Sequence, residues 1–228
     1  MGGALSAAGA GATGELSWAI HVSQRPSWVL RIAVNDESYH QWCRRLRSED
    51  EYIRIEAAEN PPDGLPEIIV SKLIQALSDD DPLVRVSAAE SLGTYDTRES
   101  RRALLDAIEC ETDELVLGYA VSSLGLIAEI DDIPLISRQI KHRTKDVARV
   151  HSVLGLFFAG RCVAKELLCD LLEDKSISVR ICAANALVLV CASDRDEDVL
   201  AALRARIATE DTGIAENLKE ALAKIEDA

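Results

Sequence analysis

The chain has 228 residues, a formal net charge of −14 from 25 Lys plus Arg against 39 Asp plus Glu, and a hydrophobic content of 48%. This negative balance argues against nucleic acid and membranes as partners, because phosphate backbones and anionic lipid surfaces attract basic proteins. The hydrophobic content indicates a packed core, and aliphatic side chains and alanine must fill it because aromatic residues make up only 4%.

Targeting signals and cysteine usage favour the cytoplasm. Residues 1–20 lack the basic and apolar regions of a signal peptide, and no window reaches the roughly 18 apolar residues of a membrane span. The six cysteines form no C-x-x-C pair, which is typical of reduced thiols. The first six residues fit the loose N-myristoylation pattern, but no polybasic second anchor follows, so lipidation is left open.

Residues 1–48 differ in composition from the rest of the chain. Residues 1–14 are rich in Gly, Ala and Ser, which indicates a flexible segment, while residues 28–34 suit a short strand and residues 38–47 a helix. All three tryptophans, Trp18, Trp28 and Trp42, fall in this part. We expect a non-repeat cap that covers the apolar flank of the first repeat. An exposed aromatic docking site is the alternative.

From residue 49 onward a short phrase, V-R-x-x-A-A-x-x-L, recurs about every 31 to 35 residues. The fullest copy is residues 84–93 and another strong copy is residues 179–187, while weaker copies begin at residues 53, 116, 148 and 214. Apolar residues at the first, fifth and ninth positions, such as Val84, Ala88 and Leu92, lie on one face of a helix. The phrase therefore predicts one buried helix in every repeat.

A second amphipathic segment precedes each copy, so the unit is a helical hairpin. An acidic break separates its two helices, as in residues 78–82, where Asp81 can cap the next helix and Pro82 suits its first turn. Neither helix can bury its apolar face alone, so the hairpins must stack. We predict an all-α fold, an α-solenoid of about six helical hairpins over residues 49–228 with the non-repeat cap over residues 1–48.

The residues of the second copy carry a family resemblance. Gly64-Leu65-Pro66-Glu67, the run from Leu77 through Asp79-Asp80-Asp81-Pro82 to Arg85, and Ala88-Ala89 with Leu92-Gly93 resemble the HEAT repeat of the phycobilisome-lyase-like subtype. The resemblance covers about residues 49–226. It implies two-helix repeats in a curved solenoid, with the second helices lining the concave face, and a role in protein binding.

Charged residues recur at fixed phrase positions. An arginine stands at the second position of four copies, and an aspartate stands four residues before the first two: Arg54, Arg85, Arg149 and Arg180, with Asp50 and Asp81. The resemblance implies that such arginines and turn aspartates form a structural ladder between hairpins. The third copy breaks the pattern with Leu117, and Lys145 replaces the acid before Arg149. We therefore expect different packing in the middle of the array.

The fourth and seventh phrase positions lie opposite the buried seam of the second helix and form a predicted exposed ribbon on the concave face. Its candidate partner-binding residues are Glu56, Glu59, Ser87, Glu90, Tyr119, Ser122, His151 and Asn185. The ribbon is acidic towards its ends and offers Tyr119 and His151 in its middle. A tyrosine flanked by carboxylates is a plausible anchor for a basic partner, and an ordinary solvated face is the alternative.

The sequence contains no pattern typical of an enzyme. The four histidines occur singly, without H-E-x-x-H, without spacing suited to zinc and without the His-Glu pairs of HEAT-like deoxyhypusine hydroxylases. There is no phosphate-binding loop and no G-x-S-x-G elbow. We expect no catalytic residues, no metal and no cofactor.

The function predicted from the sequence is a cytoplasmic, non-catalytic scaffold or adaptor that binds a protein with a basic surface. One alternative is an immunity or inhibitor protein that masks a basic toxin such as a nuclease. Another is a bilin lyase-like enzyme subunit, although the resemblance lies in residues that set the fold and transfers function poorly. A self-assembling structural module is a third alternative.

Overall fold

A computed structural model describes residues 36–64, 66–142, 146–192 and 196–227 of the chain. Throughout these residues the regular structure is helical, with twelve α-helices, one short 3-10 helix and no strand. The all-α prediction is therefore confirmed for the described part. The strand expected at residues 28–34, together with Trp18, Trp28 and Lys145, lies outside the described residues, and the division at residue 48 stays a prediction.

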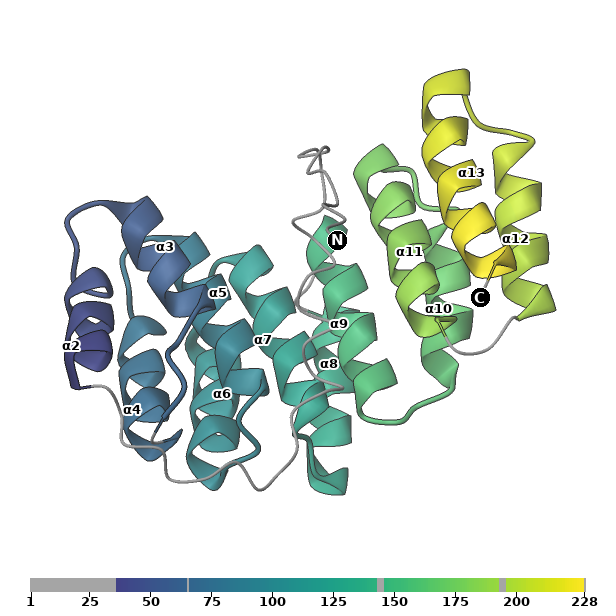
Figure 1. Ribbon diagram of the computed structural model, residues 1–228. Coiled ribbons are helices and arrows are strands. Elements are labelled where there is room, and N and C mark those ends of the chain that lie inside the picture. Colours follow the sequence, from purple (N-terminus) through teal and green to yellow (C-terminus); the bar gives the residue numbers. More distant parts are fainter. Residues whose placement is uncertain (1–35, 65, 143–145, 193–195, 228) are drawn as a thin grey trace, which may run out of the picture. The chain divides into compact units, whose positions relative to one another are not determined.

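The helices follow one another with short connections (Figure 1). In chain order they are α2 (Asp36–Arg45), α3 (Glu51–Glu59), α4 (Pro66–Ala76), α5 (Pro82–Gly93), α6 (Arg98–Cys110), α7 (Glu114–Leu126), η1 (Ile130–Asp132), α8 (Ile133–His142), α9 (Asp146–Phe158), α10 (Val163–Leu171), α11 (Ile177–Val190), α12 (Glu197–Ile207) and α13 (Thr212–Glu226).

Successive helices pair into hairpins, and the hairpins stack. Each first helix packs on the second helix of its own hairpin, as α4 does on α5 and α10 on α11. The second helices, α3, α5, α7, α9, α11 and α13, also pack on one another in series (Figure 1). This arrangement confirms the predicted α-solenoid. Helix α2 lies where the sequence predicts a helix over residues 38–47, and it packs on α3.

Aspartates begin most of the second helices, because the first turn of a helix leaves backbone N–H groups without a partner. The Asp81 carboxylate accepts hydrogen bonds from the N–H groups of Leu83 (2.8 Å) and Val84 (3.3 Å), and Pro82 follows as the first helical residue. Asp50 caps α3 in the same way through the N–H of Tyr52 (2.9 Å). The capping role predicted for Asp81 is confirmed.

The core consists of the apolar seams of these helices. Val84, Ala88 and Leu92, the first, fifth and ninth phrase residues of the second copy, are fully buried. Trp42 of α2 is also buried, and its indole Nε1–H donates to the carbonyl oxygen of Ala57 at 2.7 Å. Trp42 therefore ties α2 to α3 through both apolar contact and a hydrogen bond.

Glycines bring the central second helices unusually close together. A Cβ added to Gly125 of α7 would lie 2.2 Å from the carbonyl oxygen of Gly155 on α9, and one added to Gly155 would lie 2.6 Å from the carbonyl oxygen of Val121. No side chain fits between backbones at these distances. The close approach of α7 and α9 thus depends on glycine at both positions.

Candidate protein-binding surface

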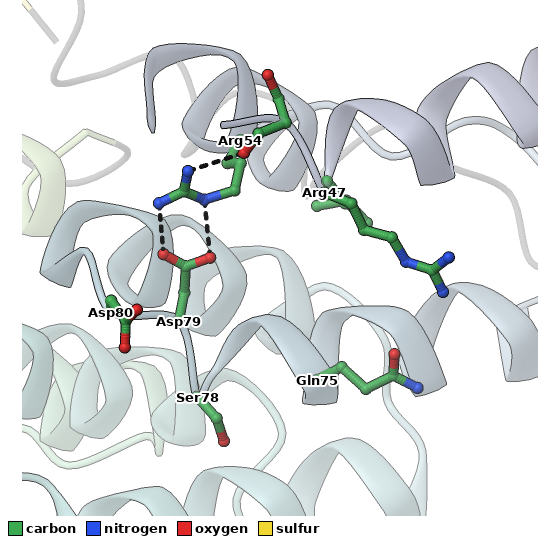
Figure 2. A pocket seen from close by; sticks show the side chains of 8 residues that line it. Arg47, Arg54, Gln75, Ser78, Asp79 and Asp80 are labelled. Carbon is green, nitrogen blue, oxygen red and sulfur yellow. Dashed lines mark hydrogen bonds and ion pairs between the residues drawn. The ribbon is translucent and has the colours of Figure 1, made fainter. Parts of the chain in front are cut away.

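Four phrase arginines each join their own hairpin to the next one along the chain. Arg54 of α3 donates from Nε and Nη2 to the two carboxylate oxygens of Asp79, at 2.9 and 3.0 Å (Figure 2). Its Nη1 donates to the carbonyl oxygens of Ser48 and Glu49, at 2.9 and 3.2 Å. One guanidinium therefore holds the turn before its own helix and the turn of the following hairpin.

The ion pair with an acid of the following hairpin recurs in later repeats. Arg85 pairs with Glu111 at 2.9 and 3.3 Å while its Nη1 donates to the carbonyl oxygens of Asp79 and Asp80. Arg149 pairs with Asp174, and Arg180 pairs with Glu210 and donates to the carbonyl oxygens of Asp174 and Lys175. Arg54, Arg85, Arg149 and Arg180 with these acids are called the arginine ladder below.

The acids of the arginine ladder differ from those that the sequence suggested. Asp50 and Asp81 do not pair with the arginines that follow them, because their carboxylates cap their own helices. The pairing acids are Asp79, Glu111, Asp174 and Glu210, which lie in the turns of the following hairpins, 25 to 30 residues away. These acids could have been predicted from the sequence, because each of them lies in the turn between the two helices of its hairpin.

An open, polar hollow of about 380 Å³ lies beside the first rung of this ladder, at the turns of the first two hairpins. Arg54 and Asp79 line it as a bonded pair, whereas the carboxylate of Asp80 points away from the guanidinium (Figure 2). Because the Arg54 guanidinium and the Asp79 carboxylate already bond each other, neither of them is left unsatisfied to bind a ligand in this hollow.

The predicted ribbon is exposed at its beginning and closed in its middle. Glu56, Glu59 and Asn185 are exposed, whereas Glu90, Tyr119 and His151 are partly buried. Ser87 and Ser122 are buried, which corrects the expectation that every fourth and seventh phrase residue is exposed. The reason is that α5 and α7 pack against a second helix on both sides, and a short serine side chain at such a helix contact is covered by its neighbours.

Carboxylates gather where the ribbon crosses α3 and α5. The Ser87 hydroxyl donates to Glu59 Oε1 at 3.4 Å, and Glu56 pairs with Arg45 of α2 at 2.6 Å. Burial, and next the negative charge of Glu59, raise the pKa of Glu90 to about 7. Within the described residues no cation forms an ion pair with Glu59 or Glu90, so this part of the ribbon carries uncompensated negative charge.

Two rings stack in the middle of the ribbon. Tyr119 of α7 and His151 of α9 have centroids 4.0 Å apart and planes inclined by 29°. Burial lowers the pKa of His151 to about 4, so the imidazole is neutral at pH 7. The two side chains therefore face each other across the helix contact, which leaves them less available as anchors for a partner.

Within the described residues, neither histidines nor cysteines converge on a metal site. The parts of the chain that the structure describes hold no group of three or more His, Cys, Asp or Glu side chains able to bind a metal ion. Among the same residues, no helix is both long and apolar enough to cross a membrane.

Comparison with known proteins finds similarity to solved structures and to one family model. Two crystal structures of engineered proteins are similar to this chain: one at 18% identity over 83% of this chain and 97% of the other, with a TM-score of 0.41, and one at 17% over 85% and 100%, with a TM-score of 0.40. The comparison with curated proteins found no match.

Residues 70–157, from α4 to α9, match the family model of HEAT repeats. The finer resemblance to the phycobilisome-lyase-like subtype finds no support in these comparisons. The match shows that residues 70–157 are similar to HEAT repeats, and it agrees with the stacked helical hairpins of this part of the chain.

Proposed function

We propose that this protein is a non-catalytic scaffold that binds a partner protein with a basic surface through the ribbon on α3 and α5. HEAT repeats generally serve as protein-interaction scaffolds. The observation that carries the proposal is the pair of carboxylates Glu59 and Glu90 on neighbouring second helices, with Glu90 partly buried. A lysine or arginine from a partner would supply the cation that this chain does not place there.

Electrostatics favours such a partner. A carboxylate that is partly removed from water interacts strongly with an opposite charge, because the surrounding dielectric constant is low. The net charge of −14 also accelerates encounter with a basic protein and makes binding sensitive to salt. An inhibitor of a basic toxin is one form of this function. We place the protein in the cytoplasm, where its six cysteines, none of which forms a disulfide within the described residues, stay reduced.

The test is affinity capture from the source organism's lysate with wild type and two charge-reversed variants, followed by quantitative mass spectrometry. Glu59→Lys with Glu90→Lys changes the ribbon, whereas Glu99→Lys with Glu109→Lys makes the same change in charge at exposed positions of the first helix α6. We expect a basic protein to be retained by wild type and by the α6 variant and to be lost from the ribbon variant.

The captured protein is then purified and its affinity measured at two salt concentrations and over a range of pH. Because a cation favours the ionised form of Glu90, affinity should rise between pH 5 and 7 and level off above about pH 7.5. Raising NaCl from 0.05 to 0.3 M should weaken binding by about tenfold or more. Equal capture by the two variants, or an affinity independent of salt, would exclude the ribbon as the binding surface.

A further inference from the structure

A group of basic side chains lies on α2 and on the turn that follows it. His40 and Arg44 of α2 and Arg47 of the turn line an open hollow of about 440 Å³, together with Cys43. The three basic side chains are exposed, although the chain as a whole carries a net charge of −14. We call His40, Arg44 and Arg47 the α2 basic face.

Local backbone geometry brings these three residues together. His40 and Arg44 are four residues apart, so they are neighbours on the surface of α2. The backbone N–H of Arg47 donates to the carbonyl oxygen of Arg44 at 3.1 Å, and this tight turn keeps Arg47 beside the end of the helix. Trp42, about 160° from Arg44 around the helix, is buried, so the basic residues lie opposite the buried side of α2.

The α2 basic face is a different surface from the ribbon. Arg45, on the flank of α2 that meets α3, pairs with Glu56 of the ribbon at 2.6 Å. Successive residues are about 100° apart around a helix, so Arg44 lies on another flank. Among the described residues, no member of the ribbon lines the α2 hollow or the hollow beside Arg54. A ligand in the α2 hollow therefore does not need to contact the ribbon.

The two arginines of this face have no partner for their guanidinium groups. Within the part of the chain that the structure describes, the side chains of Arg44 and Arg47 form no hydrogen bond and no ion pair. Figure 2 shows the Arg47 side chain extending away from the bonded pair of Arg54 and Asp79. Two guanidinium groups that line one hollow thus keep their N–H donors available to an external anion.

The number of donors indicates which anion fits. A guanidinium forms two parallel hydrogen bonds with the oxygens of a carboxylate or a phosphate. A carboxylate carries one charge and two oxygens, so one arginine is sufficient for it. A phosphate monoester carries a charge of about −1.5 to −2 at pH 7 and three acceptor oxygens, so it can bond Arg44 and Arg47 at the same time. The two unpaired arginines therefore favour a phosphate monoester.

The surrounding charge favours a single phosphate group over a polyanion. Arg47 also lines the hollow beside Arg54, and so does Asp80, whose exposed carboxylate points away from the Arg54 guanidinium. A row of phosphates, as in a nucleic acid or on an anionic membrane, is repelled by such acids and by the net charge of −14. A short protein segment with one phosphorylated residue avoids most of this repulsion, and a lysine or arginine beside that residue would complement Asp80.

We propose that the α2 basic face binds a phosphorylated side chain of a partner protein. Arg44 and Arg47 donate hydrogen bonds to the phosphate oxygens, and a lysine or arginine next to the phosphorylated residue lies near Asp80. This site goes beyond the proposed function, because it recognises a negative group on a surface other than the ribbon. Phosphorylation of the partner then strengthens its binding to this protein.

The test uses the full chain and a rhodamine-labelled peptide, Ala-Lys-Gly-Ser-Gly-Lys-Ala with its serine phosphorylated, and follows anisotropy at pH 7.5 and 150 mM NaCl. Control peptides carry unmodified serine or glutamate at the centre. The variant of the site is Arg44→Gln with Arg47→Gln. Its matched control is Arg98→Gln with Arg138→Gln, which removes the same charge from exposed arginines of α6 and α8. Circular dichroism melts verify that both variants fold.

We expect the phosphopeptide to bind wild type and the control variant equally. It should bind the variant without Arg44 and Arg47 at least about tenfold more weakly, because charge-assisted hydrogen bonds to the phosphate are lost. It should also bind wild type at least about tenfold more tightly than either control peptide, because only the phosphate carries nearly two charges. No binding at 1 mM protein, equal binding by the two variants, or equal binding of the glutamate peptide would overturn the proposal.

Two competitors distinguish other sources of phosphate. Asp80→Asn should weaken the phosphopeptide by about threefold and leave binding of inorganic phosphate unchanged, because only the peptide offers a lysine to Asp80. Inorganic phosphate that binds as tightly as the peptide would assign the face to free phosphate and overturn a protein partner. Vesicles containing phosphatidylinositol 4-phosphate that displace the peptide from wild type would assign the face to a membrane instead.

The charge-reversed ribbon separates this site from the proposed function. Glu59→Lys with Glu90→Lys should bind the phosphopeptide at least as tightly as wild type does, because the variant carries less negative charge and its α2 basic face is unchanged. Loss of phosphopeptide binding in this variant would place the peptide on the ribbon and overturn the α2 basic face as its site.

Discussion

Arg101 of α6 forms a bidentate ion pair with Asp132 of η1, with Nε to Oδ2 at 2.7 Å and Nη2 to Oδ1 at 2.9 Å. This pair joins the third hairpin to the fourth, the one step at which Leu117 replaces the phrase arginine. Burial by itself would raise the pKa of Asp132, but the hydrogen bond from Arg101 holds it below its usual range. Helix α7 lacks an arginine that could reach the next hairpin, and Arg101 of α6 makes this contact instead.

Removal of this pair should destabilise the protein. Arg101→Ala leaves the buried Asp132 carboxylate without its cation, and we expect the free energy of unfolding to fall by about 2–4 kcal/mol. The matched control is Arg102→Ala, which breaks the exposed pair with Asp106 and should cost at most about 0.5 kcal/mol. Urea denaturation followed by circular dichroism measures both, and equal losses would contradict the bridging role of Arg101.

The glycine contact between α7 and α9 gives a second prediction. Gly125→Ala places a methyl group 2.2 Å from the Gly155 carbonyl oxygen, so the helices must separate at a cost of about 1–3 kcal/mol or more. Gly213→Ala serves as the control, since nothing lies within 4 Å of its added Cβ, and it should be neutral or stabilising by up to about 1 kcal/mol. Thermal denaturation of the two variants compares them directly, and a stable Gly125→Ala protein would refute the close contact.

Glu90 should make the folded state less stable as pH rises. Its pKa is about 7 in the folded protein because of burial and the charge of Glu59, against 4.5 ordinarily. The unfolded chain therefore loses this proton first, and stability falls between about pH 4.5 and 7. Glu90→Gln removes the effect, so we expect it to be more stable than wild type at pH 8, by at most about 3 kcal/mol, and nearly unchanged at pH 4. Urea titrations at the two pH values decide this, and the same difference at both would argue against titration of Glu90.

His151 should act in the opposite direction. Burial lowers its pKa from 6.5 to about 4, so the unfolded chain binds a proton first as pH falls, and stability is lost between about pH 6.5 and 4. His151→Phe keeps a ring against Tyr119 but does not titrate. We expect the variant to lose less stability than wild type between pH 6.5 and 4.5, measured by the shift in melting temperature. An unchanged pH dependence would mean that the His151 imidazole is hydrated in the folded protein.

The sequence determined the repeating helical hairpins, the caps and the buried seam. Asp81 before Pro82 was sufficient to predict where α5 begins, and Val84, Ala88 and Leu92 were sufficient to predict its buried face, because capping and helical periodicity depend on residues within two or three turns of each other.

Only the tertiary structure decided which groups meet between repeats. The partner of Arg54 is Asp79, not Asp50, and the partner of Arg101 is Asp132, because stacking brings together residues about one repeat apart. Stacking likewise buries Ser122 and brings the ring of Tyr119 onto that of His151. The sequence pattern placed all three residues opposite the buried seam of their own helix. Helical periodicity fixes one face of an isolated helix, whereas in a stack the neighbours on both sides determine what remains exposed.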